Sequence, residues 1–354
     1  TIQPVDETYR FLSILPMAHT YENTLGLLLP LMFGAQVYYL DRVPTPKLLV
    51  PAMQKIRPTV VLSVPLIIEK IYKSQVLPKF TSSKLMSKLY QFAPARKLFN
   101  RLAGKKLMET FGGELKFFGI GGSKLDGTVE QFLREAKFPY AIGYGLTETA
   151  PMAAGSNPSQ TFLQGVGPVM EGVQIKINDP DKSGQGEIWI KGPNVMKGYY
   201  KRPELTAETF TEDGWFKTGD LGSFDKKNRL AIRGRIKTMI LGASGENIYP
   251  EEIESIINNF RFVNESLVVE NSGKLVAMVH FNMEELEKQY QKLKDQAGNY
   301  KEKINDYIEE QKQELRDYVN ARVNNFSKLQ LVLVQHEPFE KTPTHKIKRF
   351  LYCK

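Results

Sequence analysis

Cysteine is nearly absent from this chain of 354 residues, and long apolar runs are missing. The one cysteine, Cys353, excludes an internal disulfide framework and a cysteine metal cluster, and it is compatible with a reducing compartment. Residues 25–40 are the most apolar stretch, but they fall short of the ~18 to 20 uninterrupted apolar residues that span a bilayer. The interruptions are Gly26, Pro30, Gly34 and Gln36. We therefore predict a buried core segment there.

The residues after Thr1 also lack the basic, apolar and small-residue regions of a secretory signal, and we find no internal repeat and no low-complexity tract. We predict a cytoplasmic protein, with a peripheral contact at the inner membrane face as an additional option. The length exceeds the roughly 250 to 300 residues at which single cores stop growing, so the sequence predicts two or more units.

A net charge of +9 and a pI near 9.2 raise the question of a nucleic-acid partner. The basic residues are scattered through helical stretches, and no nucleic-acid motif accompanies them. A positive field also attracts small polyanions such as nucleotides. We therefore predict no nucleic-acid partner, and the sequence does not indicate an oligomeric state.

Residues 84–111 mix apolar and basic side chains and allow two interpretations. The segment could lie on a membrane surface, or it could form two helices packed on their own domain. We favour packing, because Pro94 breaks the segment and such helices usually bury their apolar side. The side chains concerned are Leu85, Met86, Leu89, Tyr90, Phe92, Leu98, Phe99, Leu102 and Leu107, with Lys84, Lys88, Arg96, Lys97, Arg101, Lys105 and Lys106.

Apolar runs alternate with helical stretches over residues 1–164, which predicts an α/β layer. Val60 to Val64 and Leu115 to Gly119 have the character of buried strands. Residues 165–235 change to short segments with period-two alternation, as in Gly186 to Lys191, and predict a β-rich subdomain.

Residues 236–354 predict a small α+β domain that opens with a helix over 250–259. A charged helical insertion at about 284–323 follows, with Gly298-Asn299 between two helices. This insertion could offer a coiled-coil partner site or could pack as an amphipathic pair on its own domain, and we favour the packed pair.

One Gly-framed turn, residues 143–149, carries an aromatic ring, a hydroxyl and a carboxylate. Rings stack on bases, hydroxyls donate to phosphates, and Mg²⁺ prefers carboxylates, so this chemistry suits a magnesium nucleotide. Three segments of matching chemistry follow in a fixed order: Phe216 to Leu221, Gly234 to Lys237, and Lys341 to Arg349. Taken together, the four segments resemble the acyl-adenylate-forming superfamily, over a range from about Leu15 to Arg349.

Within that superfamily the chain is most similar to AMP-forming long-chain fatty-acid CoA ligases. Leu15 to Glu22 resembles the L-P-x-A-H-x-x-E segment of that subgroup, and Val64 to Tyr72 resembles its P-x-x-x-E-K-I-Y segment. Gly245 to Glu254 resembles G-E-N-I-x-P-x-x-I-E, and His345 takes a place where most of the superfamily has glycine.

The resemblance implies a multi-subdomain fold: a large domain with an α/β layer and a distorted β-barrel, then a small mobile C-terminal α+β domain. The superfamily has a Gly/Ser/Thr-rich phosphate loop upstream of the L-P-x-A-H segment, and no such loop precedes Leu15 here. Phe11 to Leu15 would be an interior strand. We therefore expect a C-terminal part of a longer protein, inactive or impaired by itself.

The implied reaction has two steps and uses ATP, Mg²⁺ and coenzyme A. A fatty-acid carboxylate first attacks the α-phosphorus to give acyl-AMP and pyrophosphate; the thiol of coenzyme A then displaces AMP. Lys346 would stabilise the charge that gathers during adenylation, Thr147 would contact the phosphates, and Glu148 would hold magnesium. The ordinary alternatives are a solvated basic tail for Lys346 and a capping carboxylate for Glu148.

The resemblance assigns the other site residues to three regions. The nucleotide pocket would contain Gly121, Gly122, Ser123, Tyr144, Gly145, Asp220, Ile232 and Arg235. Tyr144 would lie against adenine, while Asp220 and Arg235 would hold the ribose. Lys237 would be the hinge that lets the small domain rotate between the two steps. His19, Gly242 and Gly245 would lie on the acyl and coenzyme A side.

Two other functions remain open in the sequence. A fatty-acyl-AMP ligase would adenylate without transfer to coenzyme A, and a non-catalytic homologue would bind nucleotide or acyl groups only. A turn after Gly219 is the structural alternative for Asp220, and Gly119 to Gly122 by themselves could be an ordinary turn. The acyl chain length is not determined by residue spacing.

Overall fold

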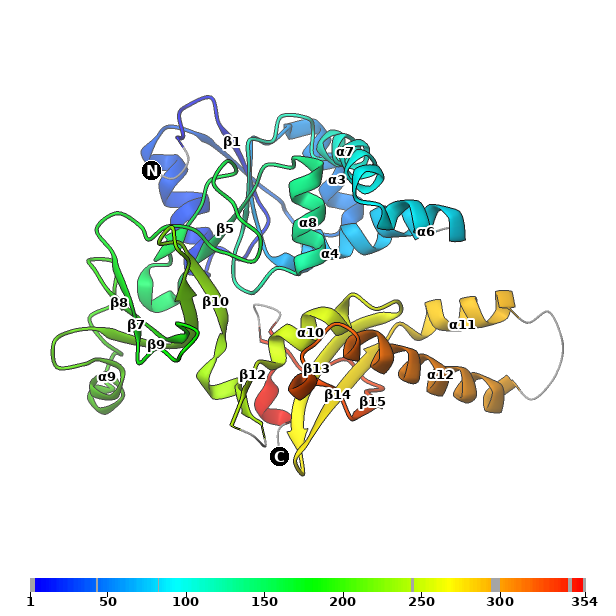
Figure 1. Ribbon diagram of the computed structural model, residues 1–354. Coiled ribbons are helices and arrows are strands. Elements are labelled where there is room, and N and C mark those ends of the chain that lie inside the picture. Colours follow the sequence, from blue (N-terminus) through cyan, green and yellow to red (C-terminus); the bar gives the residue numbers. More distant parts are fainter. Residues whose placement is uncertain are drawn as a thin grey trace. The chain divides into compact units, whose positions relative to one another are not determined.

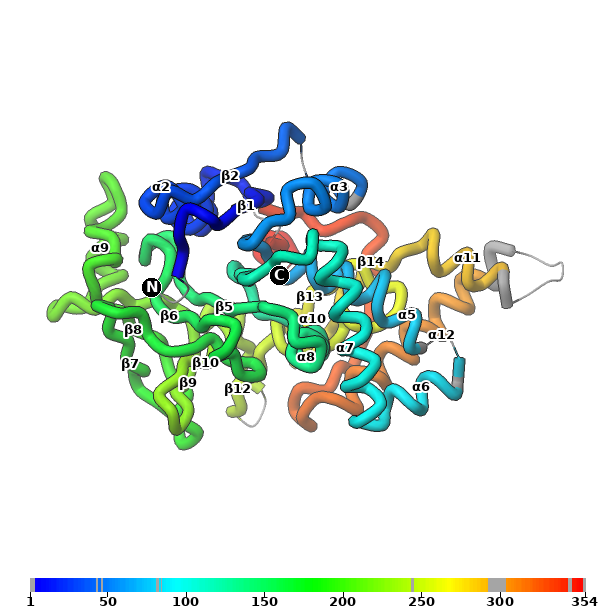
Figure 2. Tube along the Cα trace, turned by 90° about the horizontal axis from the view of Figure 1, so that it is seen from above, coloured from blue at the N-terminus to red at the C-terminus, as the bar shows by residue number. Residues whose placement is uncertain are grey.

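The computed structural model describes residues 4–42, 44–81, 83–242, 245–293, 300–342 and 346–352. The chain divides into two compact units, Thr1–Ile232 and Arg233–Lys354. Figures 1 and 2 show both units from two directions. Three features named from the sequence, Gly298-Asn299, His345 and Cys353, lie outside the described residues.

A six-stranded sheet forms the centre of the first unit, with strand order β2-β1-β3-β4-β5-β6. Strands β1 to β5 run parallel to their neighbours, and only β6 pairs antiparallel. The strands are β1 (Arg10–Ser13), β2 (Gln36–Tyr39), β3 (Val60–Ser63), β4 (Phe117–Ile120), β5 (Tyr140–Tyr144) and β6 (Ala154–Gly155). The strand predicted at 60–64 is present as β3, and the one predicted at 115–119 is present as β4, which begins two residues later; both are largely buried.

Helices cover both faces of this sheet. On one face, α3, α4, α7 and α8 share a core with Leu12, Val61 and Phe118 of the strands (Figure 1). On the other face, Tyr21 packs with Phe11 and Val60. The helices are α1 (Thr20–Glu22), η1 (Asn23–Leu28), α2 (Leu29–Met32), α3 (Pro46–Ile56), α4 (Pro65–Ile71), η2 (Tyr72–Val76), α5 (Leu77–Thr81), α6 (Lys84–Gln91), α7 (Ala93–Thr110) and α8 (Gly127–Ala136).

The prediction of a buried core segment at residues 25–40 is wrong in part. Leu31 and Met32 of α2 are 62% and 79% exposed, and Tyr39 of β2 is 54% exposed. The reason is position, since β2 is the edge strand of the sheet and α2 leads directly into it. Apolar composition alone does not distinguish an edge from a centre.

A second sheet of four antiparallel strands follows in the first unit, with order β10-β9-β8-β7. Its elements are β7 (Gln174–Asn178), β8 (Gly186–Lys191), β9 (Phe216–Phe224) and β10 (Leu230–Arg235), with helix α9 (Pro203–Thr209) between β8 and β9. Ile188, Ile190 and Phe216 form its core. The strands at its ends do not pair with each other, so the expected distorted β-barrel is an open sheet rather than a closed one.

The second unit contains a three-stranded sheet, β13-β14-β15, and helices packed on it. Leu286 of α11 and Leu315 and Val319 of α12 are fully buried in its core, which favours the packed helical pair over a coiled-coil partner site. Its elements are η4 (Ile236–Thr238), β11 (Ile240–Leu241), β12 (Asn247–Ile248), α10 (Pro250–Asn258), β13 (Val263–Asn271), β14 (Lys274–Phe281), α11 (Met283–Leu293), α12 (Tyr300–Asn320), η5 (Asn325–Ser327), β15 (Leu331–Val334) and η6 (Arg349–Leu351). Figure 2 shows α11 and α12 side by side.

Candidate functional site

The predicted nucleotide residues of the first unit gather at one edge of the parallel sheet. Strands β4 and β5 pair in parallel, with Ile120 opposite Ile142, so their carboxyl ends meet at the same edge. Gly121 to Ser123 follow β4, and Tyr144 is the last residue of β5. Open α/β sheets bind ligands outside the carboxyl ends of their strands. The topology therefore places this part of the predicted site where a ligand can reach it.

The His19 segment lies beside the same edge through the ring of Tyr21. His19 Nδ1 accepts from the backbone N–H of Tyr21 at 3.2 Å and so caps α1. The Tyr21 ring fills the space that a side chain at Gly121 would need, because a Cβ there would lie 3.3 Å from Tyr21 Cζ. Burial raises the pKa of Tyr21, so its hydroxyl stays neutral. Gly122 and Ser123 remain exposed beyond this contact.

The turn that carries Thr147 and Glu148, η3 (Thr147–Thr149), is held from several sides. Gly145 is required there, since a Cβ would come within 1.5 Å of the Pro151 carbonyl oxygen. The buried Thr149 hydroxyl accepts from Leu146 N–H at 2.8 Å. Asn194 donates to the carbonyls of Thr149 and Met152, both at 2.9 Å. A turn fixed in this way presents the exposed Thr147 hydroxyl and the half-buried Glu148 with little freedom.

Glu148 has a partner that the sequence reasoning missed. Tyr199 donates its hydroxyl to Glu148 Oε1 at 2.8 Å, and the backbone N–H of Met196 donates to the Glu148 carbonyl. Burial and the neighbouring carboxylate raise the pKa of Tyr199 to about 12, so this hydroxyl remains a donor at physiological pH. Tyr199 lies in the loop between β8 and α9. No spacing signal in the sequence links that loop to Glu148.

Glu148 fits a magnesium ion that arrives with a nucleotide better than a metal site made by protein alone. Within the described part of the chain, no group of three or more His, Cys, Asp or Glu side chains could hold a metal. Mg²⁺ commonly takes one or two carboxylates together with substrate phosphates and water. The single Glu148 carboxylate, beside the Thr147 hydroxyl, has the chemistry for that arrangement.

Tyr144 and Asp220, predicted for adenine and ribose, are in direct contact. The Tyr144 hydroxyl donates to Asp220 Oδ2 at 2.8 Å. Asp220 is only 4% exposed, and Thr218 Oγ1 accepts from its backbone N–H at 3.0 Å. Ile232 of β10 packs into the same apolar cluster as Tyr144. The structure thus brings the three predicted residues Tyr144, Asp220 and Ile232 together.

Four of the predicted residues lie at the end of β10 or beyond it, on the second unit. Arg235 and Lys237 are exposed, with Lys237 in η4. Gly242 and Gly245 belong to the turn that joins β11 to β12, in which the N–H of Gly245 donates to the carbonyl of Gly242 at 2.9 Å. These residues are therefore on a different compact unit from Tyr144 and Asp220.

Lys346 lies on a hairpin of the second unit. Its side chain is exposed, its carbonyl accepts from Thr342 N–H at 2.8 Å, and Lys341 pairs with Ile347 across the hairpin. Arg349 anchors this hairpin: Nη1 donates to both oxygens of Glu254 at 2.7 and 2.9 Å, and Nη2 donates to the Val268 carbonyl. Glu254 ends the segment Gly245 to Glu254, so two predicted motifs meet here.

A second ion pair, between Lys341 and Glu265 of β13, fastens the other strand of the hairpin. Phe339 and Tyr352 pack edge to face at 5.0 Å below it. Ion pairs of Lys341 and Arg349 therefore hold the hairpin that carries Lys346 on both of its strands. This is not the character of a solvated basic tail.

Residues 1–200 match the AMP-binding enzyme family. Among curated proteins, the chain is 31% identical over 295 residues to palmitoyl-CoA ligase FUM16 of Gibberella moniliformis, covering 75% of the chain and 43% of that protein. It is 31% identical over 297 residues to long-chain-fatty-acid–CoA ligase 1 of Saccharomyces cerevisiae, covering 76% and 42%. The chain thus spans about half the length of the curated relatives it matches.

Solved structures share the fold. The ATP-bound crystal structure of MatB from Rhodopseudomonas palustris superimposes with a TM-score of 0.71, covering 98% of this chain and 60% of that one at 21% identity. At that identity the likeness concerns the fold alone.

Proposed function

The chain belongs to the AMP-binding enzyme family, and on this premise we propose that the protein carrying it is an AMP-forming long-chain fatty-acid CoA ligase. The observation that carries the proposal is the Tyr144–Asp220 contact beside the fixed turn of Glu148, at the carboxyl edge of the sheet. The relatives named as palmitoyl-CoA and long-chain-fatty-acid–CoA ligases support the choice of substrate.

We propose that Tyr144 and Asp220 hold the nucleoside of ATP. The ring of Tyr144 is a flat surface for adenine, and the two carboxylate oxygens of Asp220 suit the two hydroxyls of a ribose. Gly121, Gly122, Ser123, Gly145 and Ile232 would line the same pocket, and Arg235 would contact the ribose from the second unit. The burial of Asp220 supports this role, because a buried carboxylate forms strong hydrogen bonds.

In the first proposed step, an oxygen of the fatty-acid carboxylate bonds to the α-phosphorus, the bond from phosphorus to the bridging oxygen breaks, and pyrophosphate leaves. Lys346 would place its ammonium group beside the oxygens that gain charge. Glu148 and Thr147 would orient the phosphates; magnesium, when bound with ATP, would neutralise part of their charge. Positioning and charge stabilisation therefore account for most of the catalysis.

In the second proposed step, the thiol of coenzyme A adds to the acyl carbon, loses its proton, and AMP leaves with the electron pair of the broken C–O bond. Lys237 would be the hinge that exchanges the Lys346 hairpin for the face that contains Gly242 and Gly245. The exposed position of Lys237 in η4, shortly after the boundary between the two units at Ile232 and Arg233, supports the hinge. His19 would face the acyl group.

The proposed partners are a fatty acid, Mg-ATP and coenzyme A, with a cytoplasmic location and a peripheral contact at the inner membrane face. No helix in the described part of the chain has the length and apolar character needed to cross a membrane. Two alternatives are kept. A fatty-acyl-AMP ligase would accumulate acyl-AMP in the presence of coenzyme A, and a non-catalytic homologue would bind nucleotide without turning it over.

Mass spectrometry of products from palmitate, ATP, Mg²⁺ and coenzyme A tests the proposal, with this chain and the natural gene product that contains it run side by side. We expect palmitoyl-CoA from the gene product, and palmitate carrying ¹⁸O in its carboxylate should transfer one labelled oxygen to AMP. Octanoate, acetate and benzoate serve as competitors. Better turnover of acetate or benzoate than of palmitate would contradict the long-chain assignment.

A further inference from the structure

Helices α6 and α7 each use one face for the core of the first unit and leave the other face open. Tyr90 of α6 and Phe99 of α7 both stack on Phe80, with ring centroids 4.8 and 5.6 Å away. Tyr90 also donates its hydroxyl to the buried Asn100 at 2.8 Å. Since both inner faces pack on the same ring, both outer faces turn away from the same core. The predicted break is present: α6 ends before Phe92, and Pro94 lies in the first turn of α7.

The open faces carry large apolar side chains. Leu85 and Phe92 are 69% and 63% exposed, and Leu98 and Leu102 of α7 are 58% and 57% exposed. Leu89 adds a fifth. Leu85 and Leu89 share one side of α6, and Leu98 and Leu102 share one side of α7, because helical side chains recur every three to four positions. Phe92 joins the two helices. Five exposed large apolar side chains on two consecutive helices and at their junction indicate a surface that binds something.

Basic side chains surround these apolar ones. Residues 97, 98, 101, 102, 105 and 106 lie on one side of α7, and four of them are Lys or Arg. None of these four side chains forms an ion pair within the described residues. They are Lys97, Arg101, Lys105 and Lys106, joined by Lys88 on α6. Glu109 is the only acidic residue between 84 and 110, so the surface has a strong positive balance.

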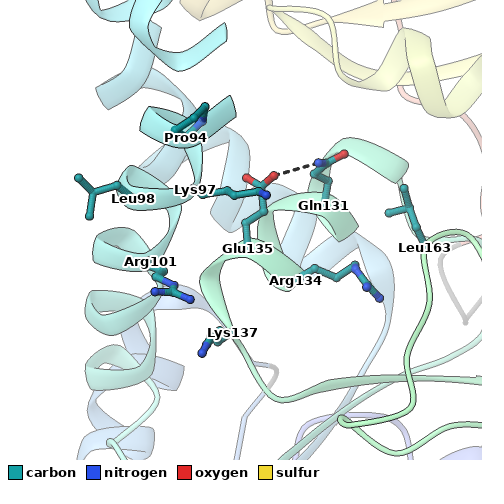
Figure 3. A pocket seen from close by; sticks show the side chains of 9 residues that line it. All are labelled: Pro94, Lys97, Leu98, Arg101, Gln131, Arg134, Glu135, Lys137 and Leu163. Carbon is teal, nitrogen blue, oxygen red and sulfur yellow. Dashed lines mark hydrogen bonds between the residues drawn. The ribbon is translucent and has the colours of Figure 1, made fainter. Parts of the chain in front are cut away.

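A cavity of about 640 Å³ beside α7 continues the positive charge (Figure 3). Lys97 and Arg101 line it from α7, and Arg134 and Lys137 line it from the end of α8. Its one carboxylate, Glu135, is already neutralised, since Arg96 donates to it at 2.9 Å. The cavity therefore offers uncompensated positive charge next to the apolar side chains of α7.

We propose that this surface docks on a membrane that contains anionic phospholipids. This surface, the α6–α7 face, consists of five apolar and five basic residues. They are Leu85, Leu89, Phe92, Leu98 and Leu102, and Lys88, Lys97, Arg101, Lys105 and Lys106. Its apolar side chains enter the boundary of the acyl chains, while its cations and the cavity contact phosphate and carboxylate headgroups. The inference locates the peripheral contact named under the proposed function, and it does not depend on the catalytic residues.

Charge complementarity selects this occupant. In a two-fold dimer, the same surface patch of each copy faces the other. A dimer through this face would therefore place Lys97, Arg101 and their neighbours against an identical set of cations. A nucleic acid would meet the charge but would leave five exposed apolar side chains without a partner. An anionic bilayer satisfies both kinds of side chain at once.

Vesicle co-sedimentation of the full chain tests the proposal, with neutral phosphatidylcholine vesicles compared with vesicles that contain about one third phosphatidylserine. We expect binding at least about tenfold tighter to the anionic vesicles, weakening as salt is raised. The triple variant Lys97→Glu, Arg101→Glu, Lys105→Glu should lose that preference, and Phe92→Ser with Leu98→Ser should weaken binding at least about fivefold.

Two control variants change comparable residues elsewhere in the first unit. Leu31→Ser with Met32→Ser removes exposed apolar side chains of α2, and Lys226→Glu with Lys227→Glu reverses exposed charges between β9 and β10. Both should bind vesicles like the unchanged chain. Equal losses in the controls, equal binding to neutral and anionic vesicles, or no binding at all would overturn the proposal.

A direct contact measurement covers the case in which a charge-reversed variant fails to fold. Leu98→Trp places an indole on the α6–α7 face, and vesicles with brominated acyl chains should quench its fluorescence beyond the signal of the two native tryptophans, Trp189 and Trp215. Absence of added quenching would contradict insertion. A dimer in sedimentation velocity that Leu98→Ser abolishes would assign the face to a second copy and overturn the membrane proposal.

Discussion

The hydroxyl of Tyr144 donates to Asp220 Oδ2 at 2.8 Å, although 76 positions separate the two residues in the chain. Tyr144 ends β5 of the six-stranded sheet, and Asp220 lies in β9 of the four-stranded sheet. One hydrogen bond thus joins the two sheets of the first unit at the proposed nucleoside pocket. Asp220, at 4% exposure, has little water to replace this partner.

Replacing Tyr144 by Phe separates the ring of that residue from its hydroxyl. We expect Tyr144→Phe to retain ATP binding within about threefold and to lower the free energy of unfolding by about 1 kcal/mol, because the stacking surface stays and one hydrogen bond is lost. Asp220→Asn should weaken ATP binding at least about tenfold, since it removes the negative charge and replaces one of the two acceptor oxygens by an NH2 donor. Calorimetric titration with ATP measures both.

Tyr140→Phe is the matched control for that pair. The Tyr140 hydroxyl donates to buried Glu130 at 3.0 Å, so the substitution removes a comparable bond away from the proposed pocket. It should destabilise the protein by a similar amount without changing ATP affinity. If Asp220→Asn binds ATP as tightly as the unchanged protein, the ribose role of Asp220 is wrong.

The contact between Tyr199 and Glu148 makes a prediction about pH. Because the pKa of Tyr199 is raised to about 12, the hydroxyl stays protonated and keeps donating to Glu148 up to pH 10. Between pH 8 and pH 10, the rate of adenylation by the natural gene product and by its Tyr199→Phe variant should therefore change with pH in the same way. A pH profile of palmitate-dependent pyrophosphate release, measured for both proteins, provides the test.

The same pair makes a prediction about magnesium. Glu148→Gln should reduce adenylation at least about 100-fold and raise the Mg²⁺ concentration needed for half-maximal rate, while Tyr199→Phe should raise that concentration only a few-fold. The larger effect falls on the residue proposed to touch the ion. An unchanged Mg²⁺ requirement in Glu148→Gln would argue that this carboxylate only caps its turn.

Arg349 and Glu254 are expected to position Lys346 without touching the substrates. Removing one partner of a buried ion pair lowers the free energy of unfolding of the protein by roughly 3 to 5 kcal/mol, because the other charge remains uncompensated. Arg349→Lys keeps the charge but loses the fork of donors, so we expect adenylation to fall about tenfold while thioester formation from preformed acyl-adenylate changes less than twofold.

A control on this prediction uses a second arginine–carboxylate pair. Arg229 donates to Asp225 at 2.6 Å in the first unit, and Arg229→Lys should alter neither half-reaction. Equal losses in both half-reactions for Arg349→Lys would mean that the pair serves stability only.

Glu22 makes a prediction about stability and pH. Burial raises the pKa of Glu22 to about 7, although a hydrogen bond from the Ser13 hydroxyl lowers it in part. Its buried Oε2 accepts no hydrogen bond. Between pH 4.5 and 7 the folded protein then binds more protons than the unfolded chain, so the free energy of unfolding falls as pH rises through that window. Glu22→Gln should raise it at pH 8 by on the order of 1 to 3 kcal/mol.

Denaturant unfolding at pH 5 and pH 8 measures this effect, with exposed Glu7→Gln as the control. Glu22→Gln should narrow the difference in unfolding free energy between the two pH values, and Glu7→Gln should leave it unchanged. If Glu22→Gln instead widened the difference in unfolding free energy between pH 5 and pH 8, the predicted effect of Glu22 on stability would be wrong in sign.

The strands of the core were predictable because their apolar residues are continuous and buried, as at Val60 to Ser63. Period two likewise predicted β8, and the glutamates of a helical first turn predicted α10. The exposure of Leu31 and Met32 was not predictable, because it depends on β2 being an edge strand, and strand order is a property of the whole sheet. The composition of a segment shows how apolar it is, but it does not show which other segments pack against it.

The candidate site shows the same division. The fixed turn at Glu148 followed from its glycines and polar residues, and the contact of Tyr144 with Asp220 agrees with the nearness that a shared pocket requires. Tyr199 was missed, because its bond to Glu148 joins a loop to a turn 51 positions away and no periodic pattern marks either. The segment 84–111 showed its composition but not which side chains face outward.

The central claim is that the protein activates a long-chain carboxylate as its adenylate, with Lys346 as the charge stabiliser. The most direct measurement is palmitate-dependent exchange of labelled pyrophosphate into ATP, without coenzyme A, by the natural gene product, by its Lys346→Ala variant and by Lys348→Ala as control. The account predicts exchange in the unchanged protein and in Lys348→Ala, and a loss of at least about 100-fold in Lys346→Ala. No exchange with any fatty acid in the unchanged protein would contradict it.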